Sequence, residues 1–280
     1  MPKKLIKLKA LSGQMFGRVT GRRIIDAIES GFTDGGTPGE SSFIEAITRG
    51  APIVAVALLG YDTKESPGKG LLLRSDVVIN KPEDFKGRTF GTRRAGPGDK
   101  LFLCEFFKSI GLDPAKDVTI IDQLPDDAMQ GYLRQRKIDG YLFHLHNGIV
   151  TIKSGLAYLY RPMNWMNPEQ SFVLLVFHRD YLAQHPESVK KVLRAFMKRI
   201  RYEHSLSAKE KERPKAFGAQ MTLEYKGMNL PQFKFPPLVP IDLLQDAQKL
   251  LIEYKIIDKK VDIEKFVDNR FVQEIYEEIK

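Results

Sequence analysis

Cysteine is almost absent from this chain of 280 residues, in which Cys104 is the only one. A single thiol excludes an intramolecular disulfide and any metal cluster built from several cysteines. Cys104 also lies in the apolar segment 101–107, so we predict a small core residue and not a catalytic thiol. No apolar run approaches the roughly 18 residues that a membrane-spanning helix needs.

Catalytic motifs are missing as well. The sequence contains no Walker phosphate loop, no nucleophile elbow and no zinc-helix motif. His144 and His146 would share one face of a strand, which suits metal ligation, but no third ligand accompanies them. Asp34 and Asp139 each follow a helix and a turn, so repeated strand starts explain them better than an acid and base pair. We therefore predict that the chain is not an enzyme and has no metal and no cofactor.

Acidic residues are outnumbered, with 35 Asp and Glu against 44 Lys and Arg, which gives a net charge of +9. Many basic residues fall in segment 190–201, where apolar residues recur at helical spacing. The basic residues are then the solvated face of an amphipathic helix. Because no motif of a nucleic-acid-binding fold accompanies them, we predict no nucleic-acid partner.

Two segments about a hundred residues apart repeat one pattern. Residues 24–34 and 129–139 each read as an amphipathic helix, a turn and an Asp that opens a short strand, and each Asp is followed by Gly. Two copies of one unit indicate two similar lobes and not a solenoid. The length suits two lobes with separate cores, so we predict an α/β chain with a cleft between the lobes.

Local patterns predict the elements of these lobes. Residues 52–59 form a continuous apolar run that suits a parallel strand covered on both faces. Residues 37–40 have the form of a capping box, with Thr37 capping the following helix and Glu40 reaching back. Further strands are expected at residues 5–11, 33–36, 70–79, 88–92, 118–121, 138–143, 156–160 and 171–177, and helices at 17–29, 186–202 and 241–254, with another ending at Gly111.

Several short sequence segments, in the order in which they occur, resemble one family. They are residues 29–34, 49–56, 81–91, 110–118 and 136–140, with a similar tail around residues 254–268 in which Lys255 stands near a position where the family often has glycine. Together they resemble the solute-binding proteins of nitrate, sulfonate and taurine-type ABC transporters, which have the periplasmic-binding-protein type II fold. The resemblance spans nearly the whole chain.

The resemblance implies a two-lobed α/β fold in which each lobe is a mainly parallel sheet flanked by helices. Lobe 1 would comprise residues 1–79, lobe 2 residues 80–170, and residues 171–280 would return to lobe 1. The implied function is to bind a small, anionic solute between the lobes as a monomer and to deliver it to the permease and ATPase subunits of an ABC transporter. The implied location is the periplasm or the cell surface.

Two departures from the family bear on that reading. The family's usual first strand and helix have no match before residue 5, and residues 1–10 are basic without the apolar core of a secretory signal. We therefore expect a start that is downstream or trimmed. Enzymes on the same scaffold, which serve thiamine-precursor or menaquinone synthesis, and ligand-sensing domains stay as alternatives. Against the thiamine type, its cysteine-rich motif is missing.

The strongest candidate for the binding site is the loop at residues 92–98. Its glycines let backbone amides approach a ligand, the following helix presents its positive end, and Arg93 and Arg94 add charge. We predict that Thr92, Arg93, Arg94 and Gly96 bind a carboxylate, sulfonate or phosphate. The alternative is a tight turn with solvated arginines.

Weaker candidates complete the predicted site. Gly36 and Thr37 form the corresponding loop of the first lobe, although an ordinary helix start explains them equally well. Ser12 follows the first expected strand. The resemblance places His144 near a ligand contact, and Trp165 lies on a loop where it either walls the cleft or packs in the fold.

Overall fold

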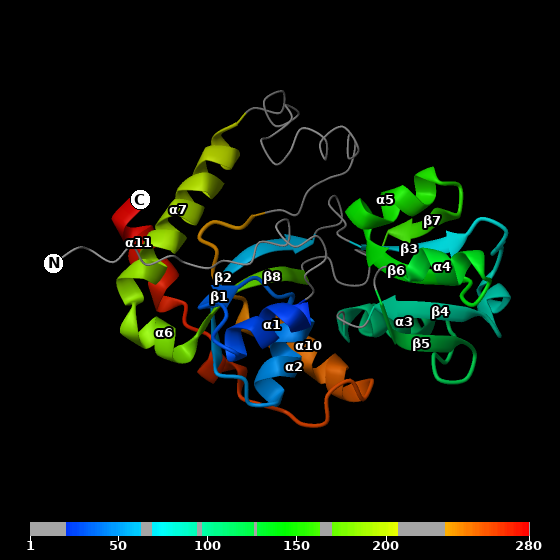
Figure 1. Ribbon diagram of the computed structural model, residues 1–280, viewed down its shortest axis with the longest axis horizontal. Coiled ribbons are helices and arrows are strands. Elements are labelled where there is room, and N and C mark those ends of the chain that lie inside the picture. Colours follow the sequence, from blue (N-terminus) through cyan, green and yellow to red (C-terminus); the bar gives the residue numbers. More distant parts are fainter. Residues whose placement is uncertain are drawn as a thin grey trace.

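The computed structural model describes residues 21–62, 69–93, 97–125, 128–162, 170–206 and 233–279. Their elements form two lobes that lie side by side, each with its own sheet (Figure 1). The three-stranded sheet of the first lobe has the order β1 (Gly35–Gly36), β8 (Gln170–His178), β2 (Ile53–Asp62). The five-stranded sheet of the second lobe has the order β5 (Thr119–Leu124), β4 (Thr89–Arg93), β6 (Gly140–His144), β3 (Lys69–Arg74), β7 (Ala157–Pro162).

Helices cover both faces of the first sheet. One core cluster joins β2 and β8 to α1 (Gly21–Glu29), α2 (Glu40–Thr48) and α10 (Ile241–Glu253). The other joins the opposite faces of these strands to α6 (Arg179–Gln184), α7 (Pro186–Ser205) and α11 (Arg270–Ile279). Ile53 and Ala55 belong to the first cluster and Val54 and Val56 to the second. The continuous apolar run of β2 is thus buried on both faces, as predicted.

The expectation of mainly parallel sheets is wrong for the described strands. In the first sheet, β8 runs antiparallel to both β1 and β2. In the second, β4 is parallel to β5 and to β6, but β3 is antiparallel to β6 and to β7. Burial on both faces requires an apolar sequence whichever way the neighbouring strand runs, so the run at β2 could not reveal the direction. The α/β, two-lobed and helix-flanked fold class is confirmed.

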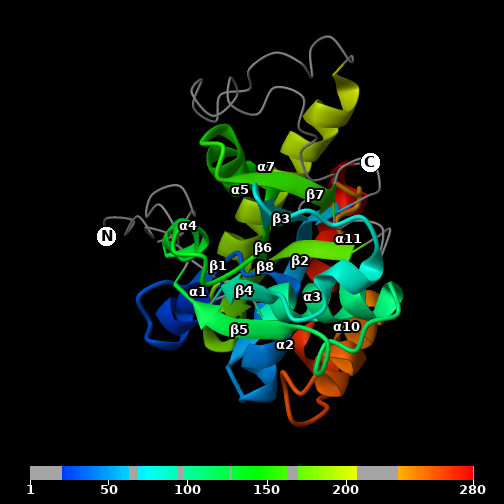
Figure 2. The same ribbon diagram turned by 90° about the vertical axis from the view of Figure 1, so that its right-hand side faces the viewer.

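The second lobe has an aromatic core on one face of its sheet. Phe85, Phe90, Phe106 and Phe107 pack there, and α3 (Pro97–Ser109) supplies the last two. The other face is covered by α4 (Met129–Arg134) and α5 (Leu145–Lys153), which follow the strands β5 and β6. Figure 2, with the second lobe in front, shows α3 between this sheet and the helices α2 and α10 of the first lobe.

Sheet pairing bears on the expected division of the chain. The strand β8 pairs with β1 and β2 within the first sheet, and residues 171–280 are expected in the first lobe. The strand β3 pairs within the second sheet, although residues up to 79 are expected in the first lobe. The lobe limits remain a prediction.

Two local predictions are corrected by tertiary contacts. The helix α2 begins at Glu40 with Gly39 as its N-cap and without a side-chain capping bond, so the expected capping box at Thr37 does not form. Segment 35–39 instead runs beside β8, where Gly39 pairs with Val173. His144 ends β6 whereas His146 lies in α5, so the two histidines do not share a strand.

The basic segment 190–201 is an amphipathic helix, as predicted. The buried side of α7 carries Val189, Leu193, Met197 and Ile200. Two of its basic residues are paired with α11, Lys190 with Glu274 at 2.7 Å and Arg194 with Glu278 at 2.5 Å.

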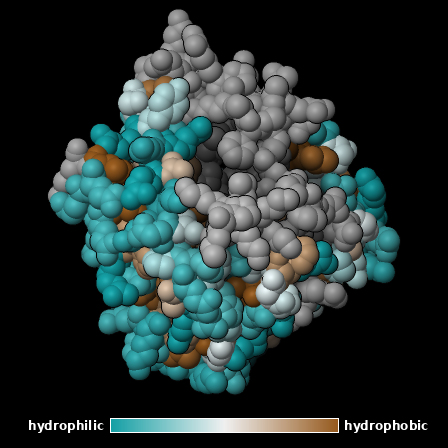
Figure 3. Space-filling view, turned by 60° about the vertical axis from the view of Figure 1, so that its left-hand side comes forward, coloured by the Kyte–Doolittle hydropathy of each residue, from teal (hydrophilic) through white to brown (hydrophobic). Residues whose placement is uncertain are grey.

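On the face shown in Figure 3, the described residues are mostly hydrophilic, with single apolar residues between them. None of the helices in the described ranges is both long and apolar enough to cross a membrane.

Candidate functional site

The N-terminal ends of two helices from different lobes meet. A Cβ atom placed on Gly98, at the start of α3, would lie 2.8 Å from Oγ of Ser41 in the first turn of α2. It would also lie 3.8 Å from Nζ of Lys69, the first residue of β3. Because a helix N-terminus carries partial positive charge and unpaired amides, α2, α3 and Lys69 together favour an anion. We name Ser41, Lys69 and Gly98 the helix-end cluster.

A third helix approaches the same place. A Cβ atom on Gly21, the first described residue of α1, would overlap Oγ of Ser42, which is the neighbour of Ser41 on α2. Both serines are buried. The absence of a side chain at Gly21 and Gly98 is therefore what allows α1 and α3 to approach the beginning of α2.

Lys69 is held on the second lobe. Its ammonium group lies 3.8 Å from the centroid of the Phe102 ring, which suits a cation–π contact. Its backbone pairs with His144 at the end of β6. The predicted candidate His144 is thus a direct neighbour of the helix-end cluster through its backbone, and its side chain lies outside what the structure describes.

Arg93, a predicted ligand contact, is paired within the protein. Its guanidinium donates two hydrogen bonds to Asp99, Nε to Oδ2 at 2.5 Å and Nη2 to Oδ1 at 2.8 Å. Asp99 is only 1% exposed, so this bidentate pair is nearly dry. The guanidinium also lies 5.0 Å from the Phe143 ring. The pair ties the end of β4 to the first turn of α3 and fixes both ends of the loop between them.

Thr92 has a similar structural role. It is fully buried, and its hydroxyl donates to Oδ1 of Asp122 at 2.5 Å. Lys100 of α3 pairs with the other oxygen of Asp122 at 3.3 Å. Ligand contacts by Thr92 and Arg93 stay predictions, and the geometry shows that both side chains already bond to carboxylates of the protein.

A chain of polar contacts joins β6 to α5. The hydroxyls of Tyr141 on β6 and Thr151 on α5 are 2.9 Å apart, and Gln130 donates to Thr151 at 3.2 Å. Burial raises the pKa of Tyr141, although the bond to Thr151 and the charge of Arg93 act in the opposite direction. Tyr141 therefore stays a neutral hydroxyl that anchors β6 to α5.

The other predicted site residues are only partly placed. Gly36 lies in β1 opposite Val176, and a Cβ atom there would overlap Ile24 of α1, so packing alone requires glycine. Thr37 follows it and is half-buried. Ser12, Arg94, Gly96 and Trp165 lie outside the described residues. Ligand contacts by all six stay predictions.

Sequence reasoning missed Ser41 and Lys69. Ser41 reads as an ordinary first-turn residue, and Lys69 as the end of a loop. Ser41 could have been identified because it lies close in sequence to the predicted first-lobe loop at Gly36 and Thr37. No local pattern shows that β3 begins next to the end of β6, because that depends on pairing between distant strands.

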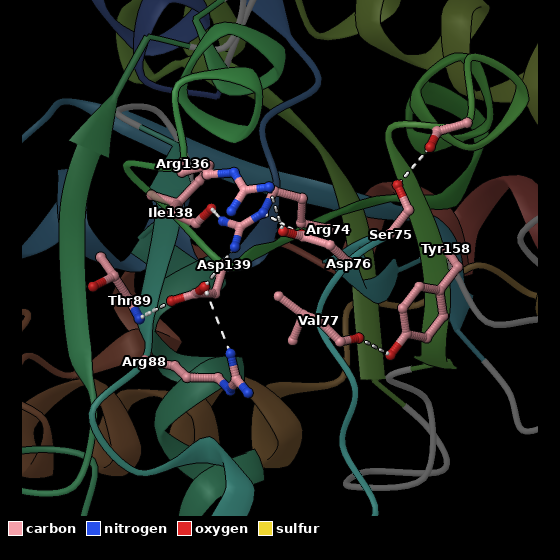
Figure 4. A network of polar contacts seen from close by, with 11 residues as sticks. Arg74, Ser75, Asp76, Val77, Arg88, Thr89, Arg136, Ile138, Asp139 and Tyr158 are labelled. Carbon is pink, nitrogen blue, oxygen red and sulfur yellow. Dashed lines mark hydrogen bonds and ion pairs between the residues drawn. The ribbon is translucent and has the colours of Figure 1, made fainter.

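Asp139 has the structural role that the sequence predicts. It accepts a hydrogen bond from the Thr89 amide at 2.9 Å and one from Arg74 at 3.1 Å, with Arg88 at 3.7 Å (Figure 4). Arg74 in turn bonds the carbonyl of Ile138. This network fastens the beginnings of β4 and β6 to the end of β3, at the edge of the sheet opposite Thr92 and Arg93. Asp139 is therefore not positioned as an acid or base beside the helix-end cluster.

Cys104 is a core residue, as predicted. It is 5% exposed, and burial raises the pKa of its thiol to about 11. A thiol with such a pKa is protonated at neutral pH and is a poor nucleophile. Within the described ranges, no group of three His, Cys, Asp or Glu side chains is arranged to hold a metal ion.

Comparison with solved structures shows the same fold in several proteins. The periplasmic aliphatic sulphonate binding protein SsuA from Escherichia coli is 19% identical with a TM-score of 0.69, over 90% of this chain and 80% of that one. The periplasmic nitrate-binding protein NrtA from Synechocystis PCC 6803 is 14% identical with a TM-score of 0.71, over 94% of this chain and 80% of that one.

An enzyme shares this fold. The desulfurization enzyme DszB is 13% identical with a TM-score of 0.64, over 96% of this chain and 90% of that one. At such identities, these likenesses show the fold alone. A search of curated protein sequences returned no match.

The sequence supplies the evidence for kinship. Residues 20–204, well over half of the chain, match the model of the family described as NMT1/THI5 like. This match and the fold confirm the family resemblance that the short sequence segments indicate. The segment from α1 through α7, which carries the helix-end cluster and both sheets, is therefore that of a family member, and the chain belongs to the NMT1/THI5-like family.

Proposed function

We propose that this protein binds a small anionic solute between its two lobes and delivers it to an ABC transporter. The observation that carries the proposal is the meeting of α2 from one lobe and α3 from the other beside Lys69. An anion there would accept hydrogen bonds from both helix ends and from the lysine ammonium. Such a ligand favours the state in which the lobes are together, because only that state offers both helix ends.

The names of the structural neighbours support this ligand class. SsuA is described as a sulphonate-binding protein and NrtA as a nitrate-binding protein, and both ligands are oxyanions. We further propose that its partners are a membrane permease and its ATPase, that it is located outside the cytoplasm, and that it acts as a monomer. The buried Arg93–Asp99 pair would shape the loop around the solute, and Arg94 and Gly96 would contact it.

The alternative is an enzyme on the same scaffold. The observation in its favour is the shared fold with DszB. The only thiol of this chain gives it no support, because Cys104 is buried and its pKa is raised to about 11. Turnover of a bound compound, followed by mass spectrometry, would distinguish an enzyme from a protein that releases the compound unchanged.

Thermal unfolding against a panel of sulfonates, nitrate, carboxylates and pyrimidines tests the proposal. A ligand at a hundred times its dissociation constant stabilises the native state by about 2.7 kcal/mol. We expect a clear rise in Tm with one class of anion, and that compound should be recovered unchanged. Failure of every anion, with a rise for a neutral compound, would refute the anionic class.

Lys69→Met sharpens the test. The change removes the charge and keeps a long apolar side chain against Phe102, so we expect the Kd for the anion to rise about tenfold, or about 1.4 kcal/mol, with little change in Tm without ligand. The matched control is Lys153→Met, on the exposed last turn of α5 in the same lobe. Affinity is measured by calorimetry. If the Lys69 variant and the wild type bind the anion equally well, Lys69 does not contribute to the binding site.

A further inference from the structure

One helix of the second lobe is also part of the first-lobe core. Phe102 and Phe106 of α3 pack in the aromatic core of the second lobe. Leu101, on the same helix, is buried in the cluster formed by α1, α2, β2 and α10 of the first lobe. The helix α3 is therefore the element at which the two cores meet, and we call this contact the seam. Gly98 in the first turn of α3 belongs to the helix-end cluster.

Two polar contacts extend this seam toward the end of α3. The hydroxyl of Tyr254, directly after α10, donates to Glu105 of α3. One turn further, Lys108 pairs with Glu253 at 2.6 Å, and its ammonium lies 5.9 Å from the Tyr254 ring. Lys255 follows with φ of 54°, so the chain turns away from α10 immediately after Tyr254.

The two contacts differ in strength. The side chains of Lys108 and Glu253 are 58% and 50% exposed, and pairs of that kind contribute little. The Tyr254 hydroxyl is half-buried, and burial together with the bond to Glu105 raises the pKa of Tyr254. The hydroxyl therefore stays protonated and donates to a carboxylate, which is one of the stronger hydrogen bonds in proteins.

We propose that Tyr254 and Glu105 are positioning residues for ligand binding. Their hydrogen bond holds α3 against the first lobe so that Gly98 faces Ser41. Glu105 and Gly98 lie seven residues apart on one helix, or about 10 Å along its axis, so α3 carries any displacement at the seam to the helix-end cluster. Neither residue contacts the solute. The effect on ligand affinity rests on the function proposed above, whereas the effect on the seam does not.

Tyr254→Phe tests the seam without a ligand. Labels on Glu29→Cys of the first lobe and Lys153→Cys of the second, with Cys104→Ala in the background, report the distance between the lobes by electron paramagnetic resonance. We expect the variant to gain a population with a longer distance. The control is Tyr202→Phe, the same chemical change at an exposed site on α7. An unchanged distance distribution, even with a lower Tm, would overturn the proposal.

Affinity for the anion found by thermal unfolding is the second measurement. Because apparent affinity falls with the fraction of molecules in the competent state, we expect Tyr254→Phe to raise the Kd about three- to tenfold. Glu105→Gln, which keeps an acceptor, should give a smaller rise, and Lys108→Ala almost none. A longer distance with an unchanged Kd would refute the role in binding. If no anion binds at all, the function proposed above is refuted. The distance measurement still shows whether the bond between Tyr254 and Glu105 holds the two lobes together.

Discussion

The two repeated units of the chain have the same backbone plan and different anchors. In the first lobe, α1 is followed by Gly31 with φ of 69°, and the chain reaches Asp34 before β1. In the second lobe, α4 is followed by Arg136 with φ of 55°, and the chain reaches Asp139 before β6. Both helices thus end in a left-handed residue, one a glycine and one not.

The two aspartates show the larger difference. The Asp139 carboxylate holds the Thr89 amide and two arginines. Asp34 joins the first sheet through its backbone, since its carbonyl accepts from the His178 amide at 2.9 Å. Within the described residues, no ion pair forms on its carboxylate. A pattern that recurs in sequence can therefore fix the same turn twice, while among the described residues only one copy uses its carboxylate for ion pairs.

The largest expected effect is the loss of the Asp139 carboxylate. Its side chain is 21% exposed and that of Arg74 only 12%, so Asp139→Ala leaves a nearly buried guanidinium without this partner. We expect a loss of about 2 to 3 kcal/mol, measured by urea unfolding. Asp34→Ala is the matched change in the first lobe and should cost less than about 0.5 kcal/mol. Equal losses would mean that the aspartates have the same role after all.

The pH dependence of unfolding tests the buried thiol of Cys104 on α3, the helix at which the cores of the two lobes meet. The pKa of Cys104 is raised from its ordinary value of 9.0 to about 11. Well below pH 9 the thiol is protonated in both states. Between pH 9 and 11 only the unfolded chain releases the proton, so stability falls as pH rises, by at most about 1.4 kcal/mol per pH unit.

Comparison with Cys104→Ala isolates this contribution. The variant should lose less stability than the wild type between pH 9 and 11, and the two should change in parallel below pH 9. Iodoacetamide at pH 8 should label the wild type only after urea unfolds it. Rapid labelling of the folded protein would contradict the buried thiol and would reopen the case for an enzyme.

The smallest expected effects concern the two left-handed residues. Gly31→Ala puts a side chain where φ is positive and should cost about 1 kcal/mol, although the space around it is open. Arg136→Gly relieves similar strain but loses the exposed pair with Asp76 and frees the unfolded chain, so its net effect should be near zero. Thermal unfolding of both variants checks this. A large loss for Arg136→Gly would show that the pair with Asp76 matters more than its exposure suggests.

Much of the fold could be predicted from local patterns. The helices α7 and α10 are where apolar residues recur at helical spacing, and Gly111 follows α3 with φ of 82°. The resemblance also marked Lys255 as a position typical of glycine, and its φ of 54° agrees. Each of these features depends on residues within a few positions of one another, so the chain determines them before it folds.

The candidate site was less accessible to prediction. The loop after β4 was identified because its glycines and arginines are adjacent in sequence. The ion pair between Arg93 and Asp99 depends on how α3 packs. The position of Lys69 beside Gly98 depends on the pairing of β3 with β6. The residues next to Arg93 and Lys69 in the sequence do not distinguish either of them from a basic residue exposed to solvent.

The sequence by itself therefore determined the two lobes, the burial of β2 on both faces, the end of α3 and the family. Only the tertiary structure decided the strand directions, the sheet to which β3 belongs, and the meeting of Ser41 with Gly98. The physical reason is that side-chain periodicity records which face of an element is buried, whereas pairing partners and contacts between lobes arise from residues that are distant in the chain.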